Sequence, residues 1–146
     1  MSRTIVINTE KKFPIEKRFV KKIFLELSEV LKFEFCRIEV SFVSDKTIQI
    51  INKEYLNHDW ATDIITFKYA ESDVLDCELI ISYETAFDNA NKFNVDYNSE
   101  IVRLLIHGIL HVVGYDDKKQ SDRKRMKRKE NFLVKLFADK YWIFRR

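Results

Sequence analysis

The sequence predicts an α+β fold, a single domain in which a small mixed β-sheet is packed by about four to five helices. Segments that alternate apolar and polar residues, as strands do, lie in the first half of the chain, whereas helical spacing dominates the second half. The chain of 146 residues has one proline and no repeat or linker rich in glycine and serine. We therefore expect residues 1–146 to form one domain.

The individual elements follow from these patterns in chain order. Strands are predicted at residues 4–8, 36–43, 63–69 and 77–83, with a loop at 71–76. Helices are predicted at 15–33, 44–56, 83–93, 99–113 and 122–138. Ser44 or Asp45 is a suitable N-cap for the second of these helices.

Composition excludes several functional classes. No apolar run approaches the roughly 20 residues that span a bilayer, and the start of the chain lacks the apolar core of a secretion signal. Cys36 and Cys77 lie far apart without a CxxC spacing, so we expect reduced packing cysteines rather than a disulfide framework or a thiolate zinc site. A cytoplasmic protein without a membrane partner is the expectation.

The stretch LLIHGILHVVGYDD, residues 104–117, holds the candidate site. Arg103, His107 and His111 follow one another at intervals of four and should form one polar stripe on an otherwise apolar, buried helix. Such a stripe either satisfies its polar groups in the core or lines a cleft. Two histidines at i and i+4 favour a metal site, because two imidazoles can then approach one ion to about 2.0–2.1 Å. Arg103 either stabilises negative charge near the metal or pairs with a core carboxylate.

A third ligand is expected in the loop that follows this helix. Gly114 is well placed to end the helix in a left-handed conformation, which would bring Asp116 and Asp117 towards the histidines. A carboxylate is an acceptable zinc ligand, and three protein ligands leave a fourth position for water. A zinc protease would carry a glutamate directly after the first histidine, where this chain has Gly108.

A strongly basic segment follows the loop. Residues 118–129 contain eight lysines and arginines and one acidic residue, Asp122, although the net charge of the whole chain is only +3. The segment is either a solvated helix face or a platform for phosphates. The candidate phosphate-binding residues in it are Lys118, Lys119, Arg123, Lys127 and Arg128.

The histidine stretch HGILHVVGYDD resembles the signature of the YbeY family of metal-dependent endoribonucleases, which act in ribosomal RNA maturation. INKEYLNHDWATDIITF (51–67) and CELIIS (77–82) are similar to two further segments of that family. The resemblance implies that His107, His111 and Asp117 are the metal ligands, although the family has a histidine at the third position. A family arginine falls on Leu56, and a family Gly-Asp pair falls on Cys77 and Glu78.

The resemblance also implies an activity. We expect hydrolysis of single-stranded RNA at phosphodiester bonds, with one zinc ion or another divalent metal and with Arg103, His107 and His111 as the catalytic residues. The implied role is 16S rRNA processing in ribosome biogenesis, with rRNA in ribosomal particles and ribosomal proteins as partners. His58 stands where the family often has a lysine and is a further candidate for RNA contact. The alternatives are a non-catalytic ribosome-assembly factor with a structural metal and another metal-dependent hydrolase.

Overall fold

The computed structural model, which describes residues 2–11, 13–115 and 118–144, has the predicted α+β architecture. The strands are β1 (Thr4–Thr9), β2 (Glu34–Val43), β3 (Ile64–Lys68) and β4 (Val74–Ser82). The helices are α1 (Lys17–Leu31), α2 (Asp45–Leu56), α3 (Tyr83–Phe93), α4 (Tyr97–Val112) and α5 (Gln120–Lys140). The strand order is β1-β2-β4-β3. Strands β1, β2 and β4 are parallel and β3 is antiparallel to β4, so the sheet is mixed as expected.

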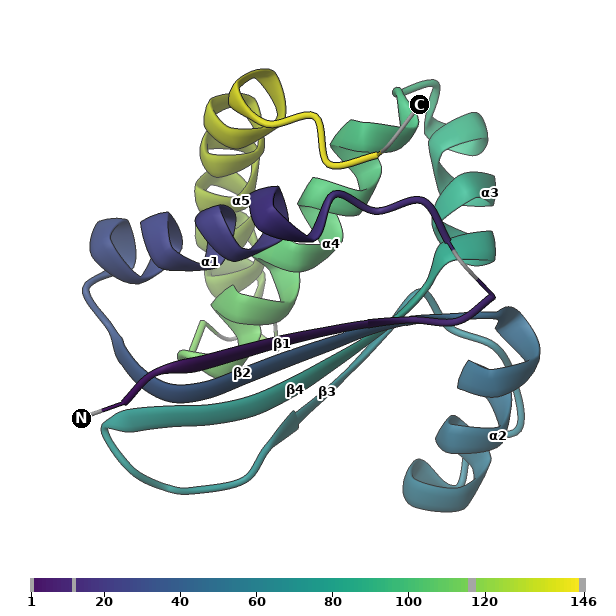
Figure 1. Cartoon of the computed structure of the whole chain (residues 1–146), viewed down its shortest axis with the longest axis horizontal. Helices are drawn as coiled ribbons and strands as arrows, with labels where there is room; N and C mark the ends of the chain where they lie inside the picture. The colour runs from purple at the N-terminus through teal and green to yellow at the C-terminus, as the bar shows by residue number, and fades with distance from the viewer. Residues whose placement is uncertain (1, 12, 116–117, 145–146) are drawn as a thin grey trace.

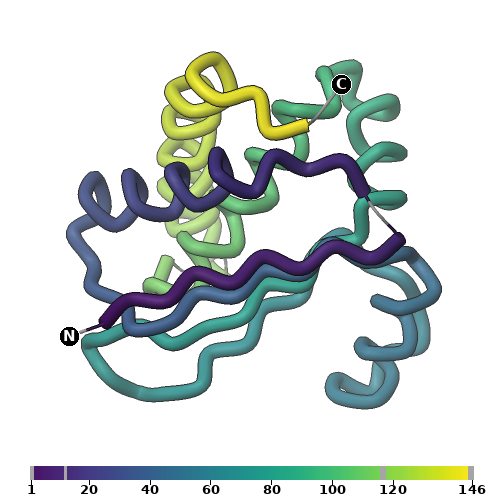
Figure 2. The backbone as a smooth tube through the Cα atoms, in the orientation of Figure 1, coloured from purple at the N-terminus to yellow at the C-terminus, as the bar shows by residue number. Residues whose placement is uncertain are grey.

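The helices are divided unequally between the two faces of the sheet. Figure 1 shows α1, α4 and α5 above one face, while α2 lies below the other. Strands β1 and β2 are parallel, so the chain returns between them through α1, which crosses over the sheet (Figure 2). The main core lies between the sheet and α1, α4 and α5, and a smaller cluster joins α2 to the opposite face.

The sequence prediction was wrong about the loop at residues 71–76. Its last three residues, Val74 to Asp76, begin strand β4 and pair with β2. Leu75 is buried and continues the inward alternation of the strand, whereas Asp76 points outward and pairs with Arg37 at 3.5 Å. Asp76 was assigned to a loop because it is polar and close to a turn, but it lies on the outer face of a strand.

The two cysteines are free thiols, as the sequence predicted. Cys77 lies in β4 within the core, and burial is the main cause that raises the pKa of its thiol to about 12. A thiol in this state is a packing residue rather than a nucleophile. Within the described part of the chain, no helix combines the length and the apolarity needed to cross a membrane.

Candidate metal centre and adjacent clefts

Helix α4 carries the candidate metal centre across the core. It is buried on most sides, and its polar stripe emerges gradually towards the surface: Arg103 and His107 are half-buried, and His111 is exposed. The stripe therefore does not end in the core. Its C-terminal half faces a position that solvent, a metal or a substrate can reach.

Gly108 lets α4 approach the sheet closely. A Cβ atom at this position would lie 2.9 Å from Ile64 Cδ1 of β3 and 2.9 Å from Leu79 Cδ2 of β4. The glutamate of a zinc protease would have to occupy this packed interface, on the side of the helix away from solvent. Close packing against the sheet thus explains why a glycine occupies this position. The same glycine leaves the site without the general base of a zinc protease.

The end of α4 turns as the sequence predicted. Gly114 has a positive φ of 111°, its N–H donates to the carbonyl of His111, and the N–H of Tyr115 donates to the carbonyl of Leu110. These two bonds are the pattern of a Schellman motif, which reverses the chain direction after a helix. Asp116 and Asp117 lie outside the described residues, so Asp117 as third ligand stays a prediction.

His107 is held in place by a buried carboxylate. Its Nδ1 lies 2.6 Å from Oε1 of Glu130 on α5, and Glu130 is only 2% exposed. An ionised carboxylate can only accept, so Nδ1 donates the hydrogen of this bond, and Nε2 is the ring nitrogen that remains for a metal. A histidine oriented by a carboxylate through one nitrogen is the common arrangement of a metal-binding imidazole. The donor set of His107 and His111 therefore fits a divalent metal such as zinc, although the part of the chain that is described holds no complete group of three ligands.

Glu130 is ionised because of its surroundings. Burial on its own would raise the pKa of this carboxyl, but the hydrogen bond from His107 and the positive charges of Lys127 and Arg103 leave the pKa below its usual value. Lys127 Nζ lies 3.2 Å and Arg103 Nη1 lies 3.5 Å from Oε2. One oxygen of Glu130 thus accepts a hydrogen bond from His107, and the other forms ion pairs with Lys127 and Arg103.

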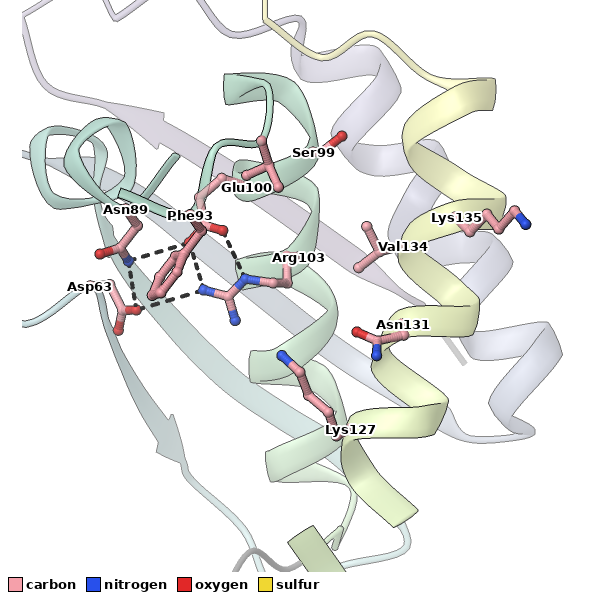
Figure 3. A pocket seen from close by; sticks show the side chains of 11 residues that line it. Asp63, Asn89, Phe93, Ser99, Glu100, Arg103, Lys127, Asn131, Val134 and Lys135 are labelled. Carbon is pink, nitrogen blue, oxygen red and sulfur yellow. Dashed lines mark hydrogen bonds and ion pairs between the residues drawn. The ribbon is translucent and has the colours of Figure 1, made fainter. Parts of the chain in front are cut away.

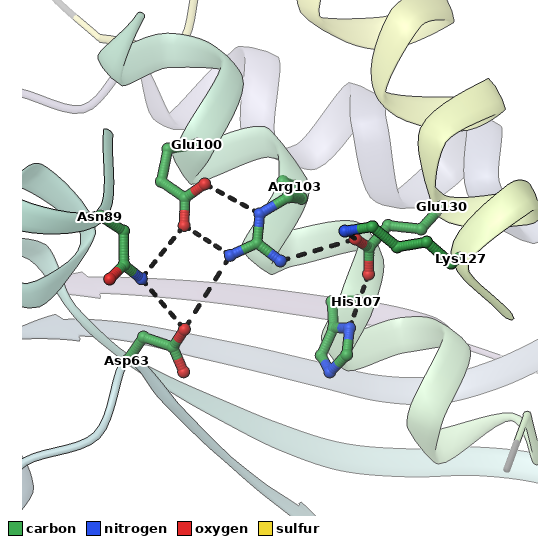
Figure 4. A network of polar contacts seen from close by, with 7 residues as sticks. All are labelled: Asp63, Asn89, Glu100, Arg103, His107, Lys127 and Glu130. Atoms are coloured by element: carbon green, nitrogen blue, oxygen red, sulfur yellow. Dashed lines mark hydrogen bonds and ion pairs between the residues drawn. The ribbon is translucent and has the colours of Figure 1, made fainter. Parts of the chain in front are cut away.

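Arg103 is the centre of a second set of ion pairs (Figure 4). It donates to both oxygens of the buried Glu100, at 2.8 Å from Nε and 2.5 Å from Nη2, and Nη2 lies 3.9 Å from Asp63. The hydrogen bonds from Arg103 to Glu100 are the main cause that raises the pKa of the guanidinium. Of the two alternatives for Arg103, the pairing with core carboxylates is therefore present, while its action on substrate charge stays a prediction.

Several residues of this network were not predicted from the sequence. Asn89 of α3 donates to Asp63 at 3.2 Å and to Glu100 at 3.3 Å, so α3 and α4 are joined to the residue directly before β3. Glu130 did leave a signal, because it shares helical spacing with the apolar Met126, Leu133 and Phe137. A single acid on the buried stripe of a basic helix indicates a buried ion pair. Asn89 left no comparable signal.

Two clefts adjoin the network. The first, the Phe93 cleft, has a volume of about 650 Å³ and lies between α3 and α5 above α4 (Figure 3). It is lined by Asp63, Asn89, Phe93, Val95, Ser99, Glu100, Arg103, Lys127, Asn131, Val134 and Lys135. The second, the His107 cleft, has a volume of about 500 Å³. It is lined by Arg103, His107, Gln120, Arg123, Lys124, Met126, Lys127 and Glu130.

Known proteins match this chain over nearly its whole length. A family model described as Endoribonuclease YbeY matches residues 5–138. The chain belongs to the YbeY family. An Endoribonuclease YbeY from Chlorobium limicola is 33% identical over 134 residues, which cover 92% of each chain. The corresponding protein of Parabacteroides distasonis is 42% identical over 102 residues, 70% of this chain and 72% of the relative.

The fold agrees with a solved structure as well. The match to the solution structure of a protein from Thermotoga maritima covers 94% of this chain and 91% of that protein's chain, with a TM-score of 0.67 and 28% sequence identity. The arrangement of helices and strands described above is thus that of a YbeY-like fold.

The predicted RNA-binding residues divide between two regions. The five basic residues are all exposed, near or in the first turns of α5, and Arg123 and Lys127 line the His107 cleft. His58 instead follows α2 and stacks on Trp60, with ring centroids 4.5 Å apart. It lines neither of the two clefts. Leu56, where the resemblance to YbeY proteins places an arginine, is the exposed last residue of α2.

Proposed function

We propose that this protein is a metal-dependent endoribonuclease that hydrolyses phosphodiester bonds of single-stranded RNA. The observation that carries the proposal is the buried Glu130, which accepts from Nδ1 of His107 and leaves Nε2 for a metal, with His111 one turn further along the same helix face. Membership of a family whose relatives are named Endoribonuclease YbeY supplies the reaction class. The basic surface beside the histidines suits a polyanionic substrate.

His107, His111 and Asp117 would hold the metal, preferably zinc. A bound divalent ion supplies Lewis-acid polarisation of a phosphoryl oxygen and activation of a water molecule. Asp117 is a harder ligand than the histidine found in the family, so other divalent metals compete better here. Glu130 keeps the proton on Nδ1 of His107, and Arg103 with Lys127 supplies positive charge beside the site.

The same site argues against the alternative hydrolases. Peptide hydrolysis by a zinc protease needs a general base at the position of Gly108, and that position packs on the sheet. A non-catalytic assembly factor with a structural metal differs from the proposed enzyme in one measurable respect, because it does not cut RNA. The activity assay therefore decides between these two.

We place the activity in the cytoplasm, in 16S rRNA processing and ribosome biogenesis, with rRNA of ribosomal particles and ribosomal proteins as partners. The support is the family assignment together with the basic surface of α5. Depletion of the protein in its host should lead to accumulation of 16S rRNA precursors, detectable by primer extension. Normal precursor levels after complete depletion would remove the ribosomal part of the proposal.

Metal content and RNA cleavage test the enzymatic proposal together. Protein purified without added metal should contain about one equivalent of zinc or another divalent ion, cleave single-stranded RNA and lose that activity with a chelator. His107→Ala and His111→Ala should each release the metal and abolish cleavage. Full metal occupancy in both variants would contradict the proposed site.

The third ligand is tested at the loop. Asp117→Asn removes the negative charge but keeps the size, so metal affinity should fall by roughly an order of magnitude or more, whereas Asp117→His should retain it. Asp116→Asn is the matched control and should change little. The reverse result for the two asparagine variants would identify Asp116 as the ligand.

A further inference from the structure

The Phe93 cleft has the features of a binding site for a flat, partly apolar group. Phe93 ends α3 with 58% of its surface exposed, although an aromatic ring of this size is normally buried. Val134 of α5 forms part of the opposite wall, and Asn131 stands beside it with an amide that can donate and accept (Figure 3). The volume of about 650 Å³ lies within the roughly 300–1,000 Å³ typical of small-molecule sites.

The two clefts differ in charge. In the Phe93 cleft, Asp63 and Glu100 balance most of the charge of the three cations Arg103, Lys127 and Lys135, so it is nearly neutral. The lining of the His107 cleft instead has four lysines and arginines against Glu130 as its one acid. A nucleotide has the same division, with a neutral aromatic base and an anionic phosphate.

The two clefts are also neighbours. Arg103 and Lys127 line both of them, so the boundary between the clefts is formed by two cationic side chains. A phosphate at this boundary would lie beside His107, and its nucleotide could extend over α4 towards α3. The distance between a phosphate and its own base is bridged by a single sugar, which suits two clefts with shared lining residues.

We propose that the Phe93 cleft binds a base of the RNA next to the scissile phosphate, by stacking on Phe93 and with Asn131 at the polar edge of the base. The inference rests on the proposed function for the identity of its ligand. Base stacking on an aromatic side chain tolerates any of the four bases, so the subsite gives affinity and register with little sequence preference. Amide groups at the base edge add a modest selectivity.

Fluorescence titration with a short probe tests the subsite. The probe is a single-stranded hexauridylate in which one central base is replaced by 2-aminopurine, and the protein carries His111→Ala so that the probe stays intact. Binding should quench the 2-aminopurine. Phe93→Ala should weaken binding by about 5- to 150-fold, and Phe93→Trp should preserve it.

Phe132→Ala provides the matched control. Phe132 is a similarly exposed phenylalanine, 61% exposed on α5, and it does not line the Phe93 cleft. Its truncation should leave affinity and quenching unchanged. Equal binding by Phe93→Ala and the parent protein, or equal losses in both alanine variants, would overturn the proposal, and an apolar protein segment would then be the better occupant of the cleft.

Cleavage kinetics locate the subsite relative to the cut bond. In a protein that retains His111, Phe93→Ala should raise KM for RNA cleavage and have a smaller effect on kcat. For the unaltered protein, a substrate with an abasic nucleotide beside the cleaved bond should have a KM raised by the same factor. On this substrate Phe93→Ala should raise KM no further. Independent, multiplying losses would place the stacking base elsewhere and overturn the proposal.

The failure of this inference differs from a failure of the proposed function. If the protein binds the probe through Phe93 but cuts no RNA, the subsite stands and the proposed enzymatic function is contradicted. If the protein cuts RNA and Phe93→Ala leaves KM unchanged, the proposed enzymatic function stands and the subsite is contradicted. Because Phe93 is largely exposed, its truncation should leave the thermal unfolding midpoint nearly unchanged, which circular dichroism can verify.

Discussion

At the scale of single residues, Glu130 connects the core to the chemistry of the site. A buried carboxylate is costly unless it is paired and hydrogen-bonded, and this one has His107 on one oxygen and two cations on the other. The carboxylate therefore stabilises the fold and the orientation of the imidazole at the same time. Glu100 is buried to a similar degree and also pairs with Arg103, but the carboxylate that accepts from the histidine is that of Glu130.

The comparison of these two glutamates yields a prediction. Glu130→Gln should lower metal affinity by about 10- to 100-fold, because the amide can no longer anchor the Nδ1 proton as a charged acceptor. Glu100→Gln should destabilise the protein to a comparable degree but leave metal affinity within about twofold. Competition with a fluorescent zinc chelator measures the affinities, and urea unfolding measures the stabilities. Equal metal affinities in the two variants would show that Glu130 is only a structural partner.

The sequence indicated one part of the site at the residue scale and missed another. His107 and His111 were evident because their spacing breaks an apolar helix, and Gly114 because it follows that helix. Glu130 lies 23 positions from His107, and a contact at such separation depends on how α5 packs on α4. Phe93 could not be distinguished from a core phenylalanine, since exposure is a property of the packed molecule.

At the scale of elements, α4 and α5 have opposite distributions of polar and apolar residues. Helix α4 is apolar with one polar stripe, and α5 is strongly basic with one buried stripe that contains Met126, Glu130, Leu133 and Phe137. The helices contact one another, so the polar stripe of α4 meets Glu130, the buried acid of α5. The basic residues of α5 that remain outside form the surface beside the histidines.

The outer face of α5 is predicted to bind RNA phosphates. Arg123→Gln combined with Lys127→Gln should weaken binding to single-stranded RNA and reduce the slope of log affinity against log salt by roughly 0.7 for each phosphate that the protein no longer neutralises. Lys21→Gln combined with Lys46→Gln removes the same charge from exposed positions on α1 and α2 and should leave the slope unchanged. Equal effects in the two double variants would mean that net charge alone, rather than α5, governs binding.

At the scale of the whole molecule, α4 is tied to the rest of the fold. One continuous core cluster contains residues from the sheet, α1, α4 and α5, and α4 supplies eight of its members: Ile101, Val102, Leu104, Leu105, Ile106, Ile109, Leu110 and Val112. The helix pattern and the strand alternation were predictable because they depend on neighbouring residues. The strand order β1-β2-β4-β3 was not, since it depends on pairings between distant segments.

Because α4 cannot leave this core without global unfolding, a metal bound to its histidines should stabilise the entire molecule. At a free zinc concentration 100 times the dissociation constant, the free energy of unfolding should rise by about 2.7 kcal/mol, and a further tenfold increase should add about 1.4 kcal/mol. Urea unfolding followed by circular dichroism at several buffered zinc concentrations measures this dependence. His111→Ala should abolish it, whereas His58→Ala, which removes the exposed histidine stacked on Trp60, should retain it. A zinc dependence that survives His111→Ala would place the stabilising metal elsewhere in the chain, and the histidine pair on α4 would then have to be explained without it.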